Sequence, residues 1–138
     1  MKKEKTKSYN FICSLDLFPF DVYFSIGETN NKFNEGIKKY LFKEDYASIR
    51  KNNDGLFILG KCTNGRCVHN FNTNHTIIRL KKYGTNIDQG VLAHEIKHAI
   101  DFILWENLGI KPKLNNVELF AYATGYLTQQ MFGKIYEK

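Results

Sequence analysis

The stretch His94-Glu95-Ile96-Lys97-His98 lies within an apolar-periodic segment that predicts a helix. Residues four apart on an α-helix lie about 40° apart around its axis and one turn apart along it, so both imidazoles can reach one metal ion. Zinc suits two imidazole nitrogens and leaves room for a third protein ligand and a water. Glu95 projects about 100° from His94, which can bring its carboxylate beside that water. The stretch therefore predicts a zinc hydrolase site, and it favours a peptidase.

The predicted helix has two faces. About 100° per residue places Asp101 and Trp105 within roughly 40° of His94. The opposite face carries Leu92, Ile96, Ala99 and Ile103. Because that face is an ordinary core stripe, the helix does not need its histidines in order to fold. Two solvated surface histidines, or two inward-facing hydrogen-bonded ones, are the structural alternatives.

A third ligand is expected downstream. After His98 the sequence contains no histidine and no cysteine, and its acidic residues are Asp101, Glu106, Glu118 and Glu137. Asp101 lies too close on the same helix. Glu106 lies near the helix end, and Glu137 lies beside the C-terminus, where chains fray. Glu118 remains.

Glu118 lies at the start of a second apolar-periodic segment. Residues 109–112 hold a glycine and a proline and predict a turn, after which a helix is expected over residues 116–132, capped by Asn115 or Asn116. This arrangement would carry Glu118 back to the histidines. The same face also carries Tyr122, Gly125, Tyr126 and Gln129, and the small residues Ala121 and Gly125 would permit close helix approach. The structural alternative is a first-turn glutamate that complements the helix dipole.

These residues resemble the gluzincin arrangement of metallopeptidases, in which two histidines and a downstream glutamate bind zinc. The context Glu118-x-x-Ala121-Tyr122 resembles the minimal, single-domain gluzincins, including short proteins encoded by tailed bacteriophages. The resemblance covers residues 85–132. Tyr122 stands where thermolysin-like enzymes carry an acidic residue, and the downstream histidine that those enzymes place at the oxyanion is missing.

The resemblance implies a role for each residue. His94, His98 and Glu118 would bind Zn²⁺, and Glu95 would take a proton from the attacking water and deliver it to the leaving amine. Tyr122 is the predicted catalytic donor to the oxyanion, with Tyr126 and Tyr83 as alternatives. Ordinary packing is the alternative for each tyrosine. Asp101 would either orient a ligand histidine or be a solvated helix residue.

Composition predicts one ordered domain. The chain has 138 residues, 43% of them hydrophobic, and a net charge of +6. Residues 1–8 are expected to be a flexible basic N-terminus, and residues 9–138 a single zincin-like α+β domain with a small, mainly antiparallel sheet, an active-site helix and a C-terminal helix. The sequence shows no signal-peptide pattern and no stretch of transmembrane length, so a cytoplasmic location is expected, in a bacterial host or a virion if the chain is phage-encoded.

The upstream half predicts the strands. Phe20–Ile26 alternates between apolar and polar residues, and residues 9–18 and 76–82 are further expected strands. Residues 33–50 predict a helix followed by a second short one. Asn64-Gly65 predicts a hairpin turn between residues 56–62 and 66–71. By the resemblance, residues 76–82 would be the edge strand that pairs with an extended substrate.

The cysteines have structural explanations. Across the predicted hairpin Cys62 and Cys67 fall opposite each other, where they could form a disulfide if oxidised; reduced thiols are expected in a cytosolic protein. Their spacing with His69 also suggests a zinc knuckle, but a fourth ligand is not evident. Cys13 lies in an apolar run and is a predicted core residue.

Three functions fit the sequence. The first is a zinc metallopeptidase that acts on a peptide or protein. The second is a catalytically idle zinc-binding protein of phage assembly, with phage or host proteins as partners. The third is nucleic-acid binding through the basic N-terminus and the Cys62/Cys67 hairpin, which the sequence favours least. Membrane association is not expected.

Overall fold

The computed structural model describes residues 7–15, 20–60, 63–70, 73–83 and 86–136. The strands are β1 (Tyr9–Leu15), β2 (Phe20–Ile26), β3 (Gly65–Asn70), β4 (His75–Leu80), β5 (Lys82–Tyr83) and β6 (Asn86–Ile87). The helices are α1 (Asn30–Tyr40), α2 (Lys43–Asn52), α3 (Asp54–Phe57), α4 (Gln89–Ile100) and α5 (Val117–Ile135). A π-helix follows α4 at Asp101–Asn107, and a 3-10 helix precedes α5 at Leu114–Asn116.

The four-stranded sheet is mixed. Its order is β1-β2-β4-β3, with β2 parallel to β4 and the two outer pairs antiparallel. Parallel neighbours need a crossover connection, which here runs through α1, α2, α3 and β3. The α+β class is confirmed. Two of the three strand pairs are antiparallel, in agreement with the expected mainly antiparallel sheet, and the third pair, β2–β4, is parallel because β4 pairs with a strand far back in the sequence.

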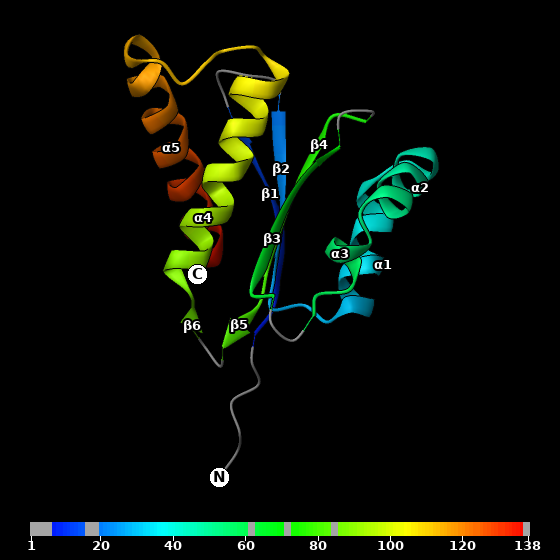
Figure 1. Ribbon diagram of the computed structural model, residues 1–138. Helices are drawn as coiled ribbons and strands as arrows, with labels where there is room; N and C mark the ends of the chain where they lie inside the picture. The colour runs from blue at the N-terminus through cyan, green and yellow to red at the C-terminus, as the bar shows by residue number, and fades with distance from the viewer. Residues whose placement is uncertain (1–6, 16–19, 61–62, 71–72, 84–85, 137–138) are drawn as a thin grey trace.

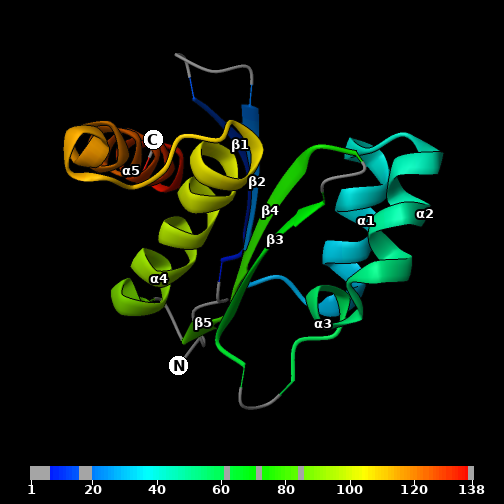
Figure 2. The ribbon, with the colours of Figure 1, turned by 45° about the horizontal axis from the view of Figure 1, so that its top comes forward.

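Helices cover both faces of the sheet. The first three helices lie on one face, and α4 and α5 lie on the other (Figures 1 and 2). β2 is therefore buried on both sides: Phe24 stacks on Phe11 at 5.3 Å, and Tyr23, on the opposite face, stacks on Tyr40 of α1 at 5.1 Å. None of the helices in the described ranges is both long and apolar enough to cross a membrane.

Local sequence signals account for the helix boundaries. Thr29 caps α1 by accepting a hydrogen bond from the Lys32 N–H at 3.1 Å, and Phe33 and Ile37, four residues apart, are buried against the sheet. Residues 33–50 are expected to hold a helix followed by a second short one; the first, α1, begins earlier, at Asn30, and α2 is the second.

The predicted hairpin at Asn64-Gly65 is wrong. Residues 54–57 form helix α3, and Gly65 begins β3, which pairs with β4 instead. A Cβ at Gly65 would lie 2.7 Å from Val91 Cγ1 of α4, so this glycine permits close packing. Cys62 lies outside the described residues; Cys67 is paired with Ile78 of β4, so the register expected for a Cys62–Cys67 pair is lost.

The predicted edge strand is also wrong. Residues 76–82 belong mostly to β4, which lies inside the sheet between β2 and β3. The two edge strands are β1 and β3, and β3 is the one that packs beside α4 (Figure 2). The sequence could not distinguish the two strands, because their order in the sheet depends on the crossover.

Candidate metal centre

Helix α4 is fixed by a cap and a core stripe. The Asp88 carboxylate accepts hydrogen bonds from the N–H groups of Gly90 and Val91 at 2.9 and 3.1 Å. The predicted apolar face is confirmed as buried: Leu92, Ile96, Ala99 and Ile103 all belong to the core between the sheet and α5. The opposite face is thereby turned to solvent.

The two histidines converge on one point. His94 and His98 are exposed, and their Nε2 atoms lie 3.0 Å apart. Two imidazole nitrogens on one tetrahedral zinc, each about 2.0–2.1 Å from the ion, lie about 3.3 Å apart, so the pair fits a shared ion. The same distance also fits a hydrogen bond between a neutral imidazole N–H and its neighbour.

Glu95 faces the sheet from the next position on the helix. Its side chain is only 8% exposed, and its Oε1 lies 4.0 Å from His94 Nε2. Burial raises the pKa of Glu95, while the charges of His94, His98 and Arg66 oppose this effect. The carboxyl therefore binds a proton more readily than an exposed glutamate, which suits a group that takes up and releases protons.

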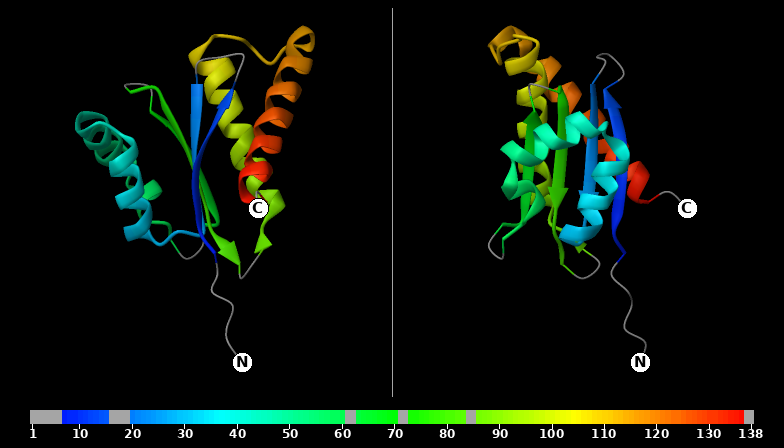
Figure 3. Two further views of the ribbon diagram at one scale, coloured as in Figure 1. Left: turned by 180° about the vertical axis from the view of Figure 1, so that it is seen from behind. Right: turned by 90° about the vertical axis from the view of Figure 1, so that its right-hand side faces the viewer.

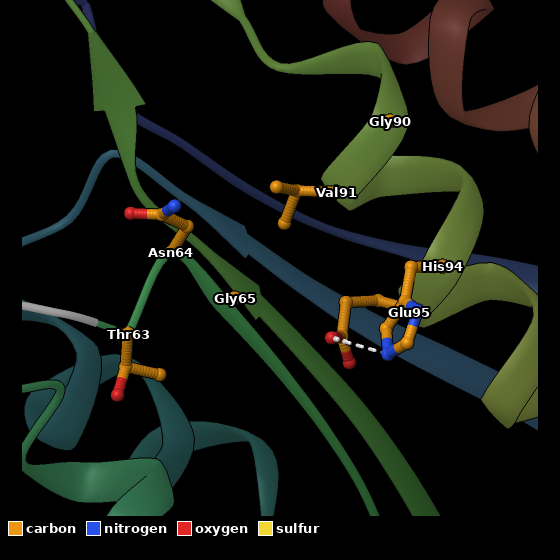
Figure 4. A pocket seen from close by; sticks show the side chains of 7 residues that line it. All are labelled: Thr63, Asn64, Gly65, Gly90, Val91, His94 and Glu95. Atoms are coloured by element: carbon orange, nitrogen blue, oxygen red, sulfur yellow. Dashed lines mark ion pairs between the residues drawn. The ribbon is translucent and has the colours of Figure 1, made fainter.

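An open hollow of about 470 Å³ lies beside Glu95 and His94. Figure 4 shows the two side chains on α4, across from residues 63–65 at the start of β3. Its lining residues are Thr63, Asn64, Gly65, Gly90, Val91, His94 and Glu95. A Cβ on Gly65 would lie 3.2 Å from Glu95 Cγ, so a side chain at this position would crowd the carboxylate.

The outer edge of β3, with which no strand of the described residues pairs, runs along this hollow. Asn64 O accepts a hydrogen bond from Lys81 N at 2.8 Å, which makes residues 64 and 81 a hydrogen-bonded pair. Because antiparallel pairs alternate, the N–H and C=O groups of Gly65, Cys67 and His69 point away from β4. Their side chains share the face that packs on α4.

The Cys67 thiol lies on this face. Burial raises the pKa of this thiol, and the nearby charge of Glu95 raises it further.

Phe102 links the second histidine to β3. Its ring stacks on His98 at a centroid distance of 6.3 Å and on His69 of β3 at 6.1 Å. Phe102 lies in the π-helix that follows α4 directly, and Leu108 N donates to Ile103 O five residues back, as π-helical geometry requires. Sequence reasoning missed Gly65, Cys67 and Phe102, because their roles depend on the β3–α4 contact.

Glu118 is not brought to the histidines. Glu118 lies in the first turn of α5. Two residues later Phe120 is buried, and the centre of the Phe120 ring lies 6.0 Å from Lys97 Nζ of α4. Two residues correspond to about 200° around a helix, so the exposed Glu118 lies on the side of α5 away from α4. Among the described residues, no three histidine, cysteine, aspartate or glutamate side chains gather closely enough to hold a metal ion.

The other predicted residues are also placed. Tyr122 is 65% exposed, on the same outer face of α5 as Glu118, and Tyr126 packs partly against the core. The side chain of Tyr83 lies outside the described part of the structure. Both Asp101 oxygens accept hydrogen bonds from Lys97 Nζ, at 2.6 and 2.8 Å, so Asp101 forms a surface ion pair rather than orienting a histidine.

Comparison of the chain with protein-family models, with curated proteins and with solved structures gives no match.

Proposed function

We propose that the protein is a zinc-dependent metallopeptidase of zincin-like architecture. The observation that carries the proposal is the convergence of His94 Nε2 and His98 Nε2 at 3.0 Å, next to the buried carboxylate of Glu95. A hydrogen bond between the two rings would give the same distance, and we prefer zinc because the buried Glu95 carboxylate lies beside them, where a zinc-bound water needs a base. When bound, zinc lowers the pKa of water to about 7 and polarises a carbonyl.

Glu95 is the proposed general base. Its position beside His94 Nε2 places the carboxylate within reach of a water held between the two residues. Burial favours its protonated form, so after accepting a proton the carboxyl can hold it until the leaving amine takes it. Removing such a base costs about 10²–10⁴-fold in rate.

The β3 edge is the proposed place for substrate. The outward N–H and C=O groups of Gly65 and Cys67 offer hydrogen bonds to an extended peptide, which would then lie across the hollow beside Glu95. This assigns to β3 the role that the resemblance suggested for residues 76–82. An unfolded or extended segment of a protein is the substrate class that such an edge accepts.

Glu118 as third ligand and Tyr122 as oxyanion donor remain predictions. Both lie on the outer face of α5, so each role requires that face to turn toward α4. The present placement of Glu118 favours a second candidate function, a zinc-binding protein without catalysis that uses the site for folding or for contact with a partner. In that case His94 and His98 would hold zinc with a ligand from elsewhere.

Zinc content of the purified protein tests the centre first. We expect about one zinc per chain in the wild type and none in His94→Ala. Glu118→Ala decides the third ligand, with Glu106→Ala, an exposed glutamate of the π-helix, as the matched control. Absence of zinc from the wild type after supplementation would refute the metal centre.

Cleavage of a peptide library, followed by mass spectrometry, then separates the two functions. We expect the zinc-loaded wild type to cut and zinc-loaded Glu95→Gln to be nearly inactive. A zinc-loaded wild type that cuts nothing, and that unfolds when the metal is chelated, supports the idle zinc protein.

A further inference from the structure

We infer that the outer edge of β1, at the opposite side of the sheet from the candidate metal centre, docks an extended acidic segment of another protein. β1 is the edge strand on this side of the sheet, and no described strand pairs with its outer edge (Figure 3). The surface consists of the edge at Asn10 and Ile12 and the hollow between β1 and α1.

The register shows which groups the edge presents. Gln130 of α5 donates to Ser14 O at 2.6 Å and accepts from Ser14 N at 3.1 Å, so the Ser14 backbone points away from β2. Alternation in an antiparallel pair then points the N–H and C=O groups of Asn10 and Ile12 the same way. The Gln130 side chain thus makes the two hydrogen bonds at Ser14 that a neighbouring strand would make. At Asn10 and Ile12 no strand of the described residues pairs with the edge, so an incoming strand can bind there.

A hollow of about 500 Å³ adjoins the open stretch. Ile12, 40% exposed, lies in its wall, and Tyr23 lies beneath Gly36 of α1, where a Cβ would come within 2.8 Å of the Tyr23 hydroxyl. The glycine thus leaves the space between helix and strand open. Side chains of an added strand that point to this face would enter the hollow.

Basic residues flank the edge on both faces. Lys32 and Lys39 of α1 line the hollow together with Glu35. A further carboxylate, that of Glu28, accepts a hydrogen bond from Asn10 Nδ2 at 3.1 Å but is buried, so the lysines outnumber the exposed acidic groups of the lining. On the other face Lys134 of α5 is close enough to β1 for its charge to oppose the burial effect that raises the pKa of Cys13. An incoming strand with acidic side chains would meet complementary charge.

A second copy of this chain fits the edge less well. Pairing two β1 edges would bring the lysines of both copies together, whichever sheet face each copy presents, and like charges across a strand pair are unfavourable. The charge therefore favours an acidic partner over self-association.

The test uses the full-length protein and a fluorescent hexapeptide of alternating valine and glutamate. We expect binding by fluorescence anisotropy, weakened by salt, with slowed amide hydrogen exchange at Asn10 and Ile12 in NMR. Lys39→Glu should weaken binding about threefold to fivefold, as reversal of one exposed charge allows, while Lys51→Glu on α2 should leave it unchanged. Ile12→Pro removes the backbone N–H at this position and should abolish binding. The control Ile12→Val keeps the N–H and should bind as the wild type does.

Four results would overturn the inference. Unchanged exchange at Asn10 and Ile12 at millimolar peptide would show that the edge does not bind. Equal binding of a valine–lysine hexapeptide would remove the charge argument. Dimers in sedimentation without peptide, lost in Ile12→Pro, would make a second copy the occupant. Protection at Gly65, Cys67 and His69 would instead locate the peptide at the other edge, which keeps this inference and the proposed function separable.

Discussion

Replacing Gly65 by alanine should loosen the contact between β3 and α4. The added methyl would lie 2.7 Å from Val91 Cγ1, 2.8 Å from Leu80 Cδ2 and 3.2 Å from Glu95 Cγ. Carbon atoms prefer about 3.5–4.0 Å, so α4 has to move away or Val91 has to leave its rotamer. Overpacking of this kind costs about 1–3 kcal/mol.

The free energy of unfolding is measured in urea and the Tm by heating, both followed by circular dichroism. A loss of about 2 kcal/mol corresponds to a fall in Tm of about 8 °C in a chain of this size. Gly125→Ala is the matched control: a Cβ there meets nothing within 4 Å, and the same change inside an exposed helix should stabilise by about 0.5–1 kcal/mol. If Gly65→Ala were as stable as the wild type or more stable, the close approach of β3 to α4 would be refuted.

Three further changes test other parts of the fold. Arg79 is 2% exposed and donates to the carbonyls of Leu56, Phe57 and Glu28, so Arg79→Met should cost about 3 kcal/mol in urea unfolding; a loss below 1 would contradict these bonds. Burial raises the pKa of Tyr23 to about 12 from 10.0, so ionisation favours the unfolded chain and stability should fall from pH 10 to 12, a fall that Tyr23→Phe should reduce. Burial raises the pKa of Cys13 to about 11, so iodoacetamide at pH 8 should label this thiol only after unfolding, as mass spectrometry can verify; rapid native labelling would contradict its burial.

The sequence predicted the local features of the site well. The faces of α4 follow from a 3.6-residue period, which needs no knowledge of the rest of the fold. The convergence of His94 and His98 follows from the same period, and so does the burial of Ile96 and Ile103.

The features that failed, and the orientation of Glu118, depend on contacts far apart in the sequence. Asn64-Gly65 has the chemistry of a hairpin turn, yet Gly65 lacks a side chain in order to admit α4. Glu118 is equally suited to a metal ligand and to a helix first turn, and only the packing of Phe120 on the core shows which way it faces. The order of β3 and β4 depends on the parallel crossover, which no local pattern encodes.

The π-helix after α4 also bears on how the chain tolerates changes in length. A π-helical turn holds about one residue more than an α-helical turn, so a deletion within Asp101–Asn107 can be absorbed by reversion to α-helix. The elements before and after it would keep their places, but Phe102 would rotate relative to His69. Related chains that are one residue shorter here should therefore share the fold while lacking the contact between Phe102 and His69.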